Sequence, residues 1–171
     1  MAASVREKIL ISACLMGARV RYHGGDAASD HQLLRQWLNE GRLVSACPEQ
    51  DGGLPTPRPA AEIVGPGGGR AVLAGVAIVR TAAGADVTSS FRAGADHALD
   101  LVEQHRIRIA ILKDGSPSCG STNIHDGTFS GTRIAGVGVT AALLETHGVR
   151  VFSEREIDAA GEWLRQLESG A

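Results

Sequence analysis

Three cysteines are the residues of this chain best suited to metal or sulfur chemistry: Cys14, Cys47 and Cys119. Their odd number argues against a framework of disulfides, and their spacing contains no Cys-x-x-Cys pair of the kind that builds a local zinc site. The fold would therefore have to bring the three thiols together. Three thiolates with no obvious fourth ligand suit an iron–sulfur cluster in which one iron stays open. Such an iron is a Lewis acid for soft sulfur.

Polar side chains stand close to these cysteines in the sequence. Glu49 follows Cys47 by two residues, Ser12 stands near the first cysteine, and Ser116 and Ser118 precede the third. A carboxylate beside an anionic cluster keeps its proton more readily than usual, which suits proton transfer near neutral pH. Serine hydroxyl groups can donate hydrogen bonds to a substrate or to cluster sulfur.

All three cysteines stand at the ends of predicted strands. Short apolar runs predict strands over residues 8–14, 43–47 and 108–112, and Cys119 lies in the loop that follows the last of these. In an open parallel sheet, ligands bind in the crevice outside the carboxyl ends of the strands. Thiols that are distant in sequence can therefore converge in that crevice.

The remaining pattern alternates strands with helices, which predicts a single-domain α/β fold over residues 1–171. The expected architecture is an open, mostly parallel, Rossmann-like sheet with helices on both faces and a small β-hairpin insertion. The hairpin is predicted from residues 71–79 and 85–87 around a turn at Gly84, and long loops from 51–69 and 121–136.

Composition excludes several classes of protein. The chain has 171 residues, about one domain, with 43% hydrophobic and 21% charged residues. No apolar run approaches the roughly 18 residues of a membrane span, and no signal-peptide core follows the first residues, so a cytoplasmic location is expected. The formal net charge is −2 and the basic residues are scattered, which argues against nucleic acid as partner. A small-molecule partner is expected.

Several stretches together resemble the thiouracil desulfurase family, whose members were long catalogued as a domain of unknown function. The resemblance extends from about residue 8 to 154, and the Cys-Pro-Glu and Ser-Pro-Ser-Cys-Gly boxes are its most specific parts. The matching stretches are ISACLMG (11–17), RYHGG (21–25), CPEQDGGLPTPR (47–58), KDGSPSCG (113–120), DGTFSG (126–131) and GVTAALL (138–144).

The resemblance implies a [4Fe–4S] cluster held by Cys14, Cys47 and Cys119. It also implies a non-redox removal of sulfur from 2-thiouracil, or a related thiolated base, to give uracil and sulfide. By the same comparison, Glu49 and Ser116 become the catalytic pair. We expect the substrate sulfur to bind the open iron, with Ser12 and Ser118 as substrate contacts.

Other readings of the same residues remain open. Residues 136–141 have the form Gly-x-Gly-x-x-Ala and Glu154 follows, as in dinucleotide-binding domains, although 128–135 is not a convincing strand. A sulfur carrier or accessory in RNA thiolation would use the same cysteines, but the scattered basic residues count against it. Zinc held by the cysteines and one histidine, His23 or His125, is a weaker possibility.

Overall fold

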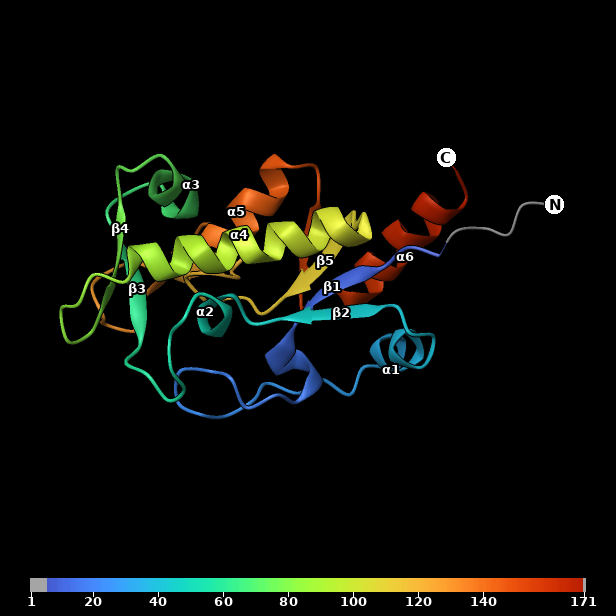
Figure 1. Ribbon diagram of the computed structural model, residues 1–171, viewed down its shortest axis with the longest axis horizontal. Coiled ribbons are helices and arrows are strands. Elements are labelled where there is room, and N and C mark those ends of the chain that lie inside the picture. Colours follow the sequence, from blue (N-terminus) through green and yellow to red (C-terminus); the bar gives the residue numbers. More distant parts are fainter. Residues whose placement is uncertain (1–5, 171) are drawn as a thin grey trace.

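A four-stranded parallel sheet forms the centre of the protein. The structure is a computed structural model that describes residues 6–170. The sheet contains β1 (Ile9–Ser12), β2 (Leu43–Ala46), β5 (Ile109–Leu112) and β8 (Arg150–Ser153) in the order β2-β1-β5-β8 (Figure 1). The chain extends the sheet from β1 first on one side and then on the other, so the topological switch point lies between β1 and β5. The predicted α/β fold is confirmed.

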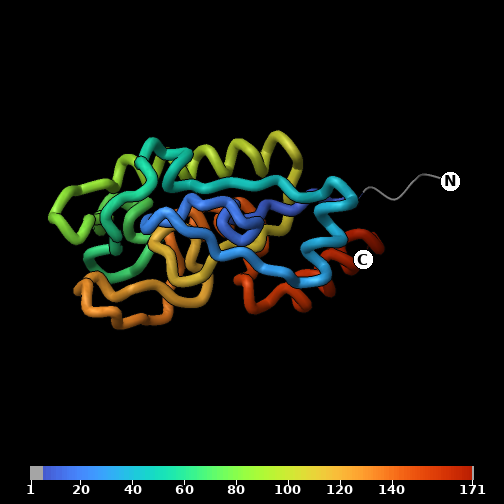
Figure 2. Tube along the Cα trace, turned by 90° about the horizontal axis from the view of Figure 1, so that it is seen from below, coloured from blue at the N-terminus to red at the C-terminus, as the bar shows by residue number. Residues whose placement is uncertain are grey.

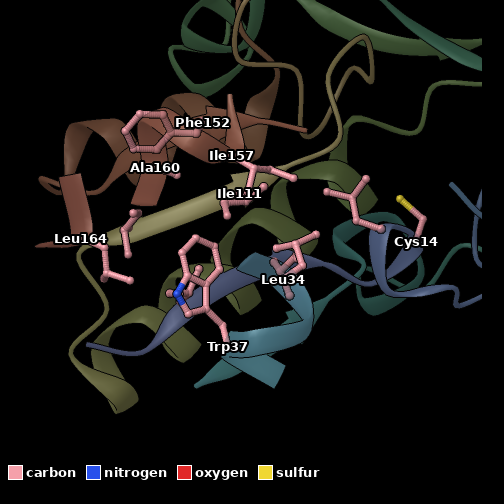
Figure 3. Packing of buried hydrophobic residues seen from close by; sticks show 12 residues of the cluster. Cys14, Leu34, Trp37, Ile111, Phe152, Ile157, Ala160 and Leu164 are labelled. Atoms are coloured by element: carbon pink, nitrogen blue, oxygen red, sulfur yellow. The ribbon is translucent and has the colours of Figure 1, made fainter. Parts of the chain in front are cut away.

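Two helices, α1 (Gln32–Asn39) and α6 (Ile157–Glu168), cover one face of this sheet. Side chains alternate between the two faces of a strand, so Ile111 of β5 points to this side. It packs in one apolar cluster with Trp37 of α1 and Leu164 of α6 (Figure 3). The periodic apolar face of each helix is thereby buried against the sheet.

The opposite face is covered by α4 (Thr88–His105) and α5 (Val139–Thr146). Leu10 and Ala110 of the central strands point to this side and pack with Leu144 of α5. Because both faces are covered, β1 and β5 are fully buried along their length. Their continuous apolar runs reflect that burial.

A small antiparallel sheet lies at one end of the molecule (Figure 1). It pairs β3 (Ala61–Val64) with β4 (Ile78–Thr81), and α3 (Gly68–Leu73) connects them. A small β-hairpin insertion is present, but the prediction placed it at the wrong residues. Residues 61–64, predicted to lie in the loop 51–69, form its first strand, and residues 71–73, predicted to be strand, belong to helix α3. The turn at Gly84 is present, but it closes a single isolated bridge.

A second antiparallel pair occupies the predicted loop 121–136. It consists of β6 (Asn123–His125) and β7 (Arg133–Ala135), and Figure 2 shows this segment, gold to orange, at the end of the molecule that also holds β3 and β4. Because β7 is not a strand of the parallel sheet, the Gly-x-Gly-x-x-Ala motif at 136–141 does not belong to a strand–turn–helix unit of that sheet. The motif therefore lacks the parallel strand that the dinucleotide-binding alternative requires.

The one-turn helix α2 (Pro48–Asp51) packs closely on α4. Its first residue is proline, which is favoured there because the missing N–H has no intrahelical partner. A Cβ atom on Gly94 of α4 would lie 1.8 Å from the Pro48 carbonyl oxygen, and one on Gly52 would lie 2.0 Å from the Ser90 carbonyl oxygen. Glycine at both positions permits this contact. No helix within residues 6–170 is long and apolar enough to cross a membrane.

Candidate functional site

A cavity of about 260 Å³ opens at the carboxyl ends of β1, β2 and β5, and all three cysteines line it. Cys14 lies two residues beyond β1 in the short 3-10 helix η1 (Ala13–Met16), Cys47 directly precedes α2, and Cys119 lies in the loop after β5. The cavity thus spans the switch point, where open α/β sheets bind their ligands. The structure brings the cysteines together as their places at strand ends led us to expect.

The three cysteines are free thiols in a poorly solvated environment. Burial raises the pKa of the Cys14 thiol to about 11, and nearby Arg21 opposes this shift. Burial also raises the pKa values of Cys47 and Cys119, and each of the other two thiols adds to the shift at Cys119. The groups are therefore close enough to interact electrostatically. Ligation of a metal would displace their protons.

Glu49 and Ser116 are brought into contact although they are far apart in the sequence. The Ser116 hydroxyl donates to Glu49 Oε2 at 3.3 Å, and Arg58 Nε donates to Glu49 Oε1 at 3.2 Å. All three residues line the cavity. Each carboxylate oxygen therefore has one donor, and the carboxylate is held between two fixed groups.

Arg58 is almost completely buried and makes further hydrogen bonds that fix its position. Its guanidinium donates to the carbonyl oxygens of Pro55 and Val20 and to the hydroxyl of Thr56. The Val20 carbonyl oxygen also lies 3.8 Å from the Cys47 sulfur, as acceptor of the thiol hydrogen. Arg58 thus connects the Glu49 carboxylate to the chain segment beside Cys47.

Ser116 is held by the loop that carries Cys119. Its hydroxyl oxygen accepts hydrogen bonds from the backbone N–H groups of Ser118, at 3.0 Å, and Cys119, at 3.2 Å. With its oxygen occupied in this way, the hydroxyl proton is directed to Glu49. Ser118, expected as a substrate contact, does not line the cavity; its fully buried hydroxyl lies 2.7 Å from the Thr140 hydroxyl.

Ser12 lines the cavity, but its hydroxyl already has partners. The oxygen accepts a hydrogen bond from the backbone N–H of Lys113 at 2.9 Å. A second hydrogen bond, between Ser12 and the Cys119 thiol, lowers the pKa of Cys119 and so opposes the larger effect of burial. Ser12 therefore connects the end of β1 to the end of β5. This arrangement favours positioning of a thiol over the expected contact with substrate.

A buried carboxylate organises the loop between β5 and β6. The side chain of Asp114 is fully buried and accepts hydrogen bonds from the backbone N–H groups of Ser121, Thr122 and Asn123, with Arg155 Nη2 at 2.7 Å. Burial alone would raise the pKa of Asp114, but the hydrogen bonds from the Thr122 side chain and the backbone N–H groups outweigh it, so the pKa is lowered. The loop that carries Ser116 and Cys119 is closed by this group.

Replacing Asp114 by Asn is expected to lower the free energy of unfolding by about 2–4 kcal/mol at neutral pH. The amide nitrogen would face the donors of Thr122, Asn123 and Arg155 in place of an acceptor. Because the folded state holds the pKa below its ordinary value of 3.8, this stabilisation is present above that pH and is lost as the pH falls below it. Urea unfolding of the cluster-free protein at neutral and acidic pH measures both effects. Equal stability of the two proteins at neutral pH would show that the carboxylate charge is not needed.

Other residues that line the cavity were not singled out as candidates from the sequence. Arg58 is the last residue of the 47–58 stretch that resembles the family, and this position is the one feature of the sequence that could have identified it. Glu62 is a single acidic residue in β3, and nothing local in the sequence connects it to the cysteines. The other charged or aromatic residues that line the cavity are Arg21, Tyr22, Lys113, Asp114, His125 and Arg133.

The two histidines considered as zinc ligands have different surroundings. His125 lines the cavity, whereas His23 does not, and its Nδ1 accepts from the backbone N–H of Gly25 at 3.0 Å. Across residues 6–170, no three His, Cys, Asp or Glu side chains are close enough together to hold a single metal ion.

Comparison with known proteins assigns the chain to a family. A family model described as 2-thiouracil desulfurase matches residues 9–156, which include the three cysteines, Glu49 and Ser116. The chain belongs to this family. It is 49% identical over 150 residues to the uncharacterized protein YbbK of Bacillus subtilis (strain 168), a match that covers 88% of this chain and 97% of the relative.

A solved structure extends the likeness to three dimensions. It is described as the [4Fe-4S]-dependent thiouracil desulfidase TudS, and it is 45% identical to this chain with a TM-score of 0.86. The match covers 94% of this chain and 99% of that chain. The 2-thiouracil desulfurase family and this neighbour therefore share both sequence and fold with the protein.

Proposed function

We propose that this protein removes sulfur from 2-thiouracil, or from a related thiolated base, and releases sulfide together with the corresponding oxo base, which is uracil in the case of 2-thiouracil. The proposal treats residues 1–171 as one desulfurase domain. The observation that carries it is the single cavity lined by Cys14, Cys47, Cys119, Glu49 and Ser116. Membership of the 2-thiouracil desulfurase family and the likeness to TudS support the choice of substrate and reaction.

A [4Fe–4S] cluster fits the donor set of the cavity. Three free thiols come from three separate chain segments, and thiolates are the usual ligands of such clusters. Cys14, Cys47 and Cys119 would hold it, and the similar structure TudS is described as [4Fe-4S]-dependent. When bound through three thiolates, the cluster would supply an iron without a protein ligand, a Lewis acid that polarises a thiocarbonyl group.

The chain's own residues would supply the proton transfer. Water must attack C2 of the thiocarbonyl, and its oxygen replaces sulfur on that carbon. Glu49, oriented by Arg58 and Ser116, would take a proton from the water, and the departing sulfur leaves as hydrogen sulfide once it is protonated. Water and 2-thiouracil balance uracil and hydrogen sulfide without any electron transfer.

Anaerobic reconstitution followed by incubation with 2-thiouracil tests the proposal. We expect brown protein with about four irons and four sulfides per chain, and stoichiometric release of uracil and sulfide. Stoichiometric zinc without iron would reject the cluster. Protein that holds the cluster but releases neither uracil nor sulfide would reject the desulfuration and leave the sulfur carrier as the alternative.

Replacing Ser116 by Ala is expected to lower kcat by roughly ten- to hundredfold while the iron and sulfide contents stay at the wild-type level. The change removes the donor that orients Glu49 but leaves every cysteine in place. Metal analysis and initial rates of uracil formation measure the two effects separately. Loss of the cluster together with activity would assign Ser116 to the structure of the Cys119 loop only.

A further inference from the structure

Glu62 is a buried acidic residue in the wall of the cavity that the mechanism above does not use. It lies in β3, is 7% exposed and reaches the cavity from the small antiparallel sheet. The next residue, Ile63, is in an apolar cluster on the other side of the strand, because successive side chains point to opposite faces. The strand therefore directs one charged side chain into the cavity.

The carboxylate of Glu62 is only half paired. Its Oε1 accepts from the backbone N–H groups of Gly127, at 2.9 Å, and Phe129, at 3.2 Å. Within the described residues 6–170, Oε2 has no hydrogen-bond donor, and no Lys, Arg or His nitrogen lies within 4.0 Å of either oxygen. Oε2 is not among the side-chain atoms that are both fully buried and without a partner, so it is accessible from the cavity and can accept a hydrogen bond from a ligand there.

The orientation of this carboxylate is set by backbone contacts. Gly127 has a φ of 92°, and a Cβ atom there would lie 2.6 Å from the Ile63 carbonyl oxygen, so the β6–β7 turn packs directly on β3. Both donors to Oε1 come from this turn. The acceptor Oε2 is therefore preorganised before any ligand arrives, which lowers the entropic cost of a contact with it.

We infer that Glu62 Oε2 accepts a hydrogen bond from a ring N–H of the thiolated base and determines which bases the cavity admits. This inference rests on the proposed function. In 2-thiouracil an N–H group flanks C2 on each side, so a base held by its sulfur presents such a donor next to the reacting carbon. A site built around a substrate N–H rejects an analogue that lacks it, because the buried acceptor then stays unpaired.

Methylated bases test the inference in the wild-type holoenzyme. The substrates are 2-thiouracil, 1-methyl-2-thiouracil and 3-methyl-2-thiouracil, with kcat/KM as the readout. Independently of turnover, calorimetry measures the Kd values of uracil and its two N-methyl forms. We expect methylation of one of the two nitrogens to weaken both quantities by at least about tenfold more than methylation of the other.

The Glu62→Gln variant separates hydrogen bonding from size. The amide oxygen can still accept from the turn, while its NH₂ group replaces the acceptor that faces the cavity. We expect kcat/KM for 2-thiouracil to fall by at least about tenfold, mainly through KM, and the penalty for the disfavoured methyl group to shrink by a similar factor. Glu162→Gln is the matched control, because Glu162 is exposed on α6 and does not line the cavity. It should keep wild-type values.

The two proposals fail in different ways. Wild-type protein that binds uracil with the expected methyl discrimination, yet releases no sulfide from 2-thiouracil, keeps the Glu62 contact and rejects the proposed reaction. Wild-type protein that desulfurates all three bases equally well rejects the Glu62 contact, even if the Gln variant does not fold. Unchanged methyl discrimination in a folded Gln variant also rejects it and leaves Glu62 only to anchor the β6–β7 turn.

Discussion

Replacing Cys119 by Ala is expected to leave the anaerobically reconstituted protein without its cluster and to lower desulfuration by at least about a thousandfold. Cys119 belongs to the loop after β5, while Cys14 and Cys47 belong to segments after β1 and β2. With one of three ligands gone, the remaining two thiols cannot define the same site. The same result is expected for Cys14→Ala and Cys47→Ala. Iron content, the visible absorption spectrum and uracil formation measure it.

Ser121→Ala is the matched control for the cysteine variants. Ser121 follows Cys119 in the same loop, and its buried hydroxyl has no hydrogen-bond partner within the part of the chain that the structure describes. The variant should retain iron, colour and activity. A Cys119→Ala protein that still holds the full cluster and turns over 2-thiouracil would overturn the proposed ligand set.

Replacing Glu49 by Gln is expected to spare the cluster and to lower kcat by roughly 10²–10⁴-fold, the usual contribution of a general base. Glutamine keeps the shape of the side chain and can accept from one of its two donors, Arg58 or Ser116, but it takes no proton from water. Iron and sulfide contents should equal those of the wild type. Single-turnover rates of uracil formation under anaerobic conditions measure the loss.

Glu145→Gln provides the comparison for Glu49→Gln. Glu145 of α5 is paired with Arg70 of α3 and does not line the cavity, so its replacement changes the charge of the protein without changing the site. If Glu49→Gln retains full activity in protein with a complete cluster, the proton must be moved by another group, and the assigned role is wrong.

The central sheet could be predicted because each of its strands contains a short apolar run that is bounded by polar residues or glycine. β1 and β5 are buried on both faces, so their side chains are apolar on both sides of the strand and the run is recognised without any alternation of polar and apolar residues. β6 and β7 are only three residues long, and β7 is exposed throughout. Such strands carry no burial pattern, and their pairing depends on contacts between distant segments. For the same reason 121–136 was expected to be a loop.

The cysteines could be placed because the carboxyl ends of parallel strands share one edge of a sheet. Glu62 could not, since β3 reaches the cavity from a separate sheet whose position is set by tertiary packing. Ser118 shows a different limit. It neighbours Cys119, but in an irregular loop the direction of each side chain follows from backbone turns that proximity in sequence does not reveal. Its hydroxyl pairs with Thr140 away from the lining residues.

The close contact between α2 and α4 has a consequence for how this protein can change by mutation. A helix of one turn has little stability of its own, so α2 takes its orientation from the long helix beneath it. A methyl group at Gly94 would displace Pro48, and with it the thiol and the carboxylate on either side. Substitutions in α4 are therefore unequally constrained. Its solvent-facing positions can vary, whereas a side chain at position 94 would change the positions of Cys47 and Glu49, although Gly94 contacts neither reactive group.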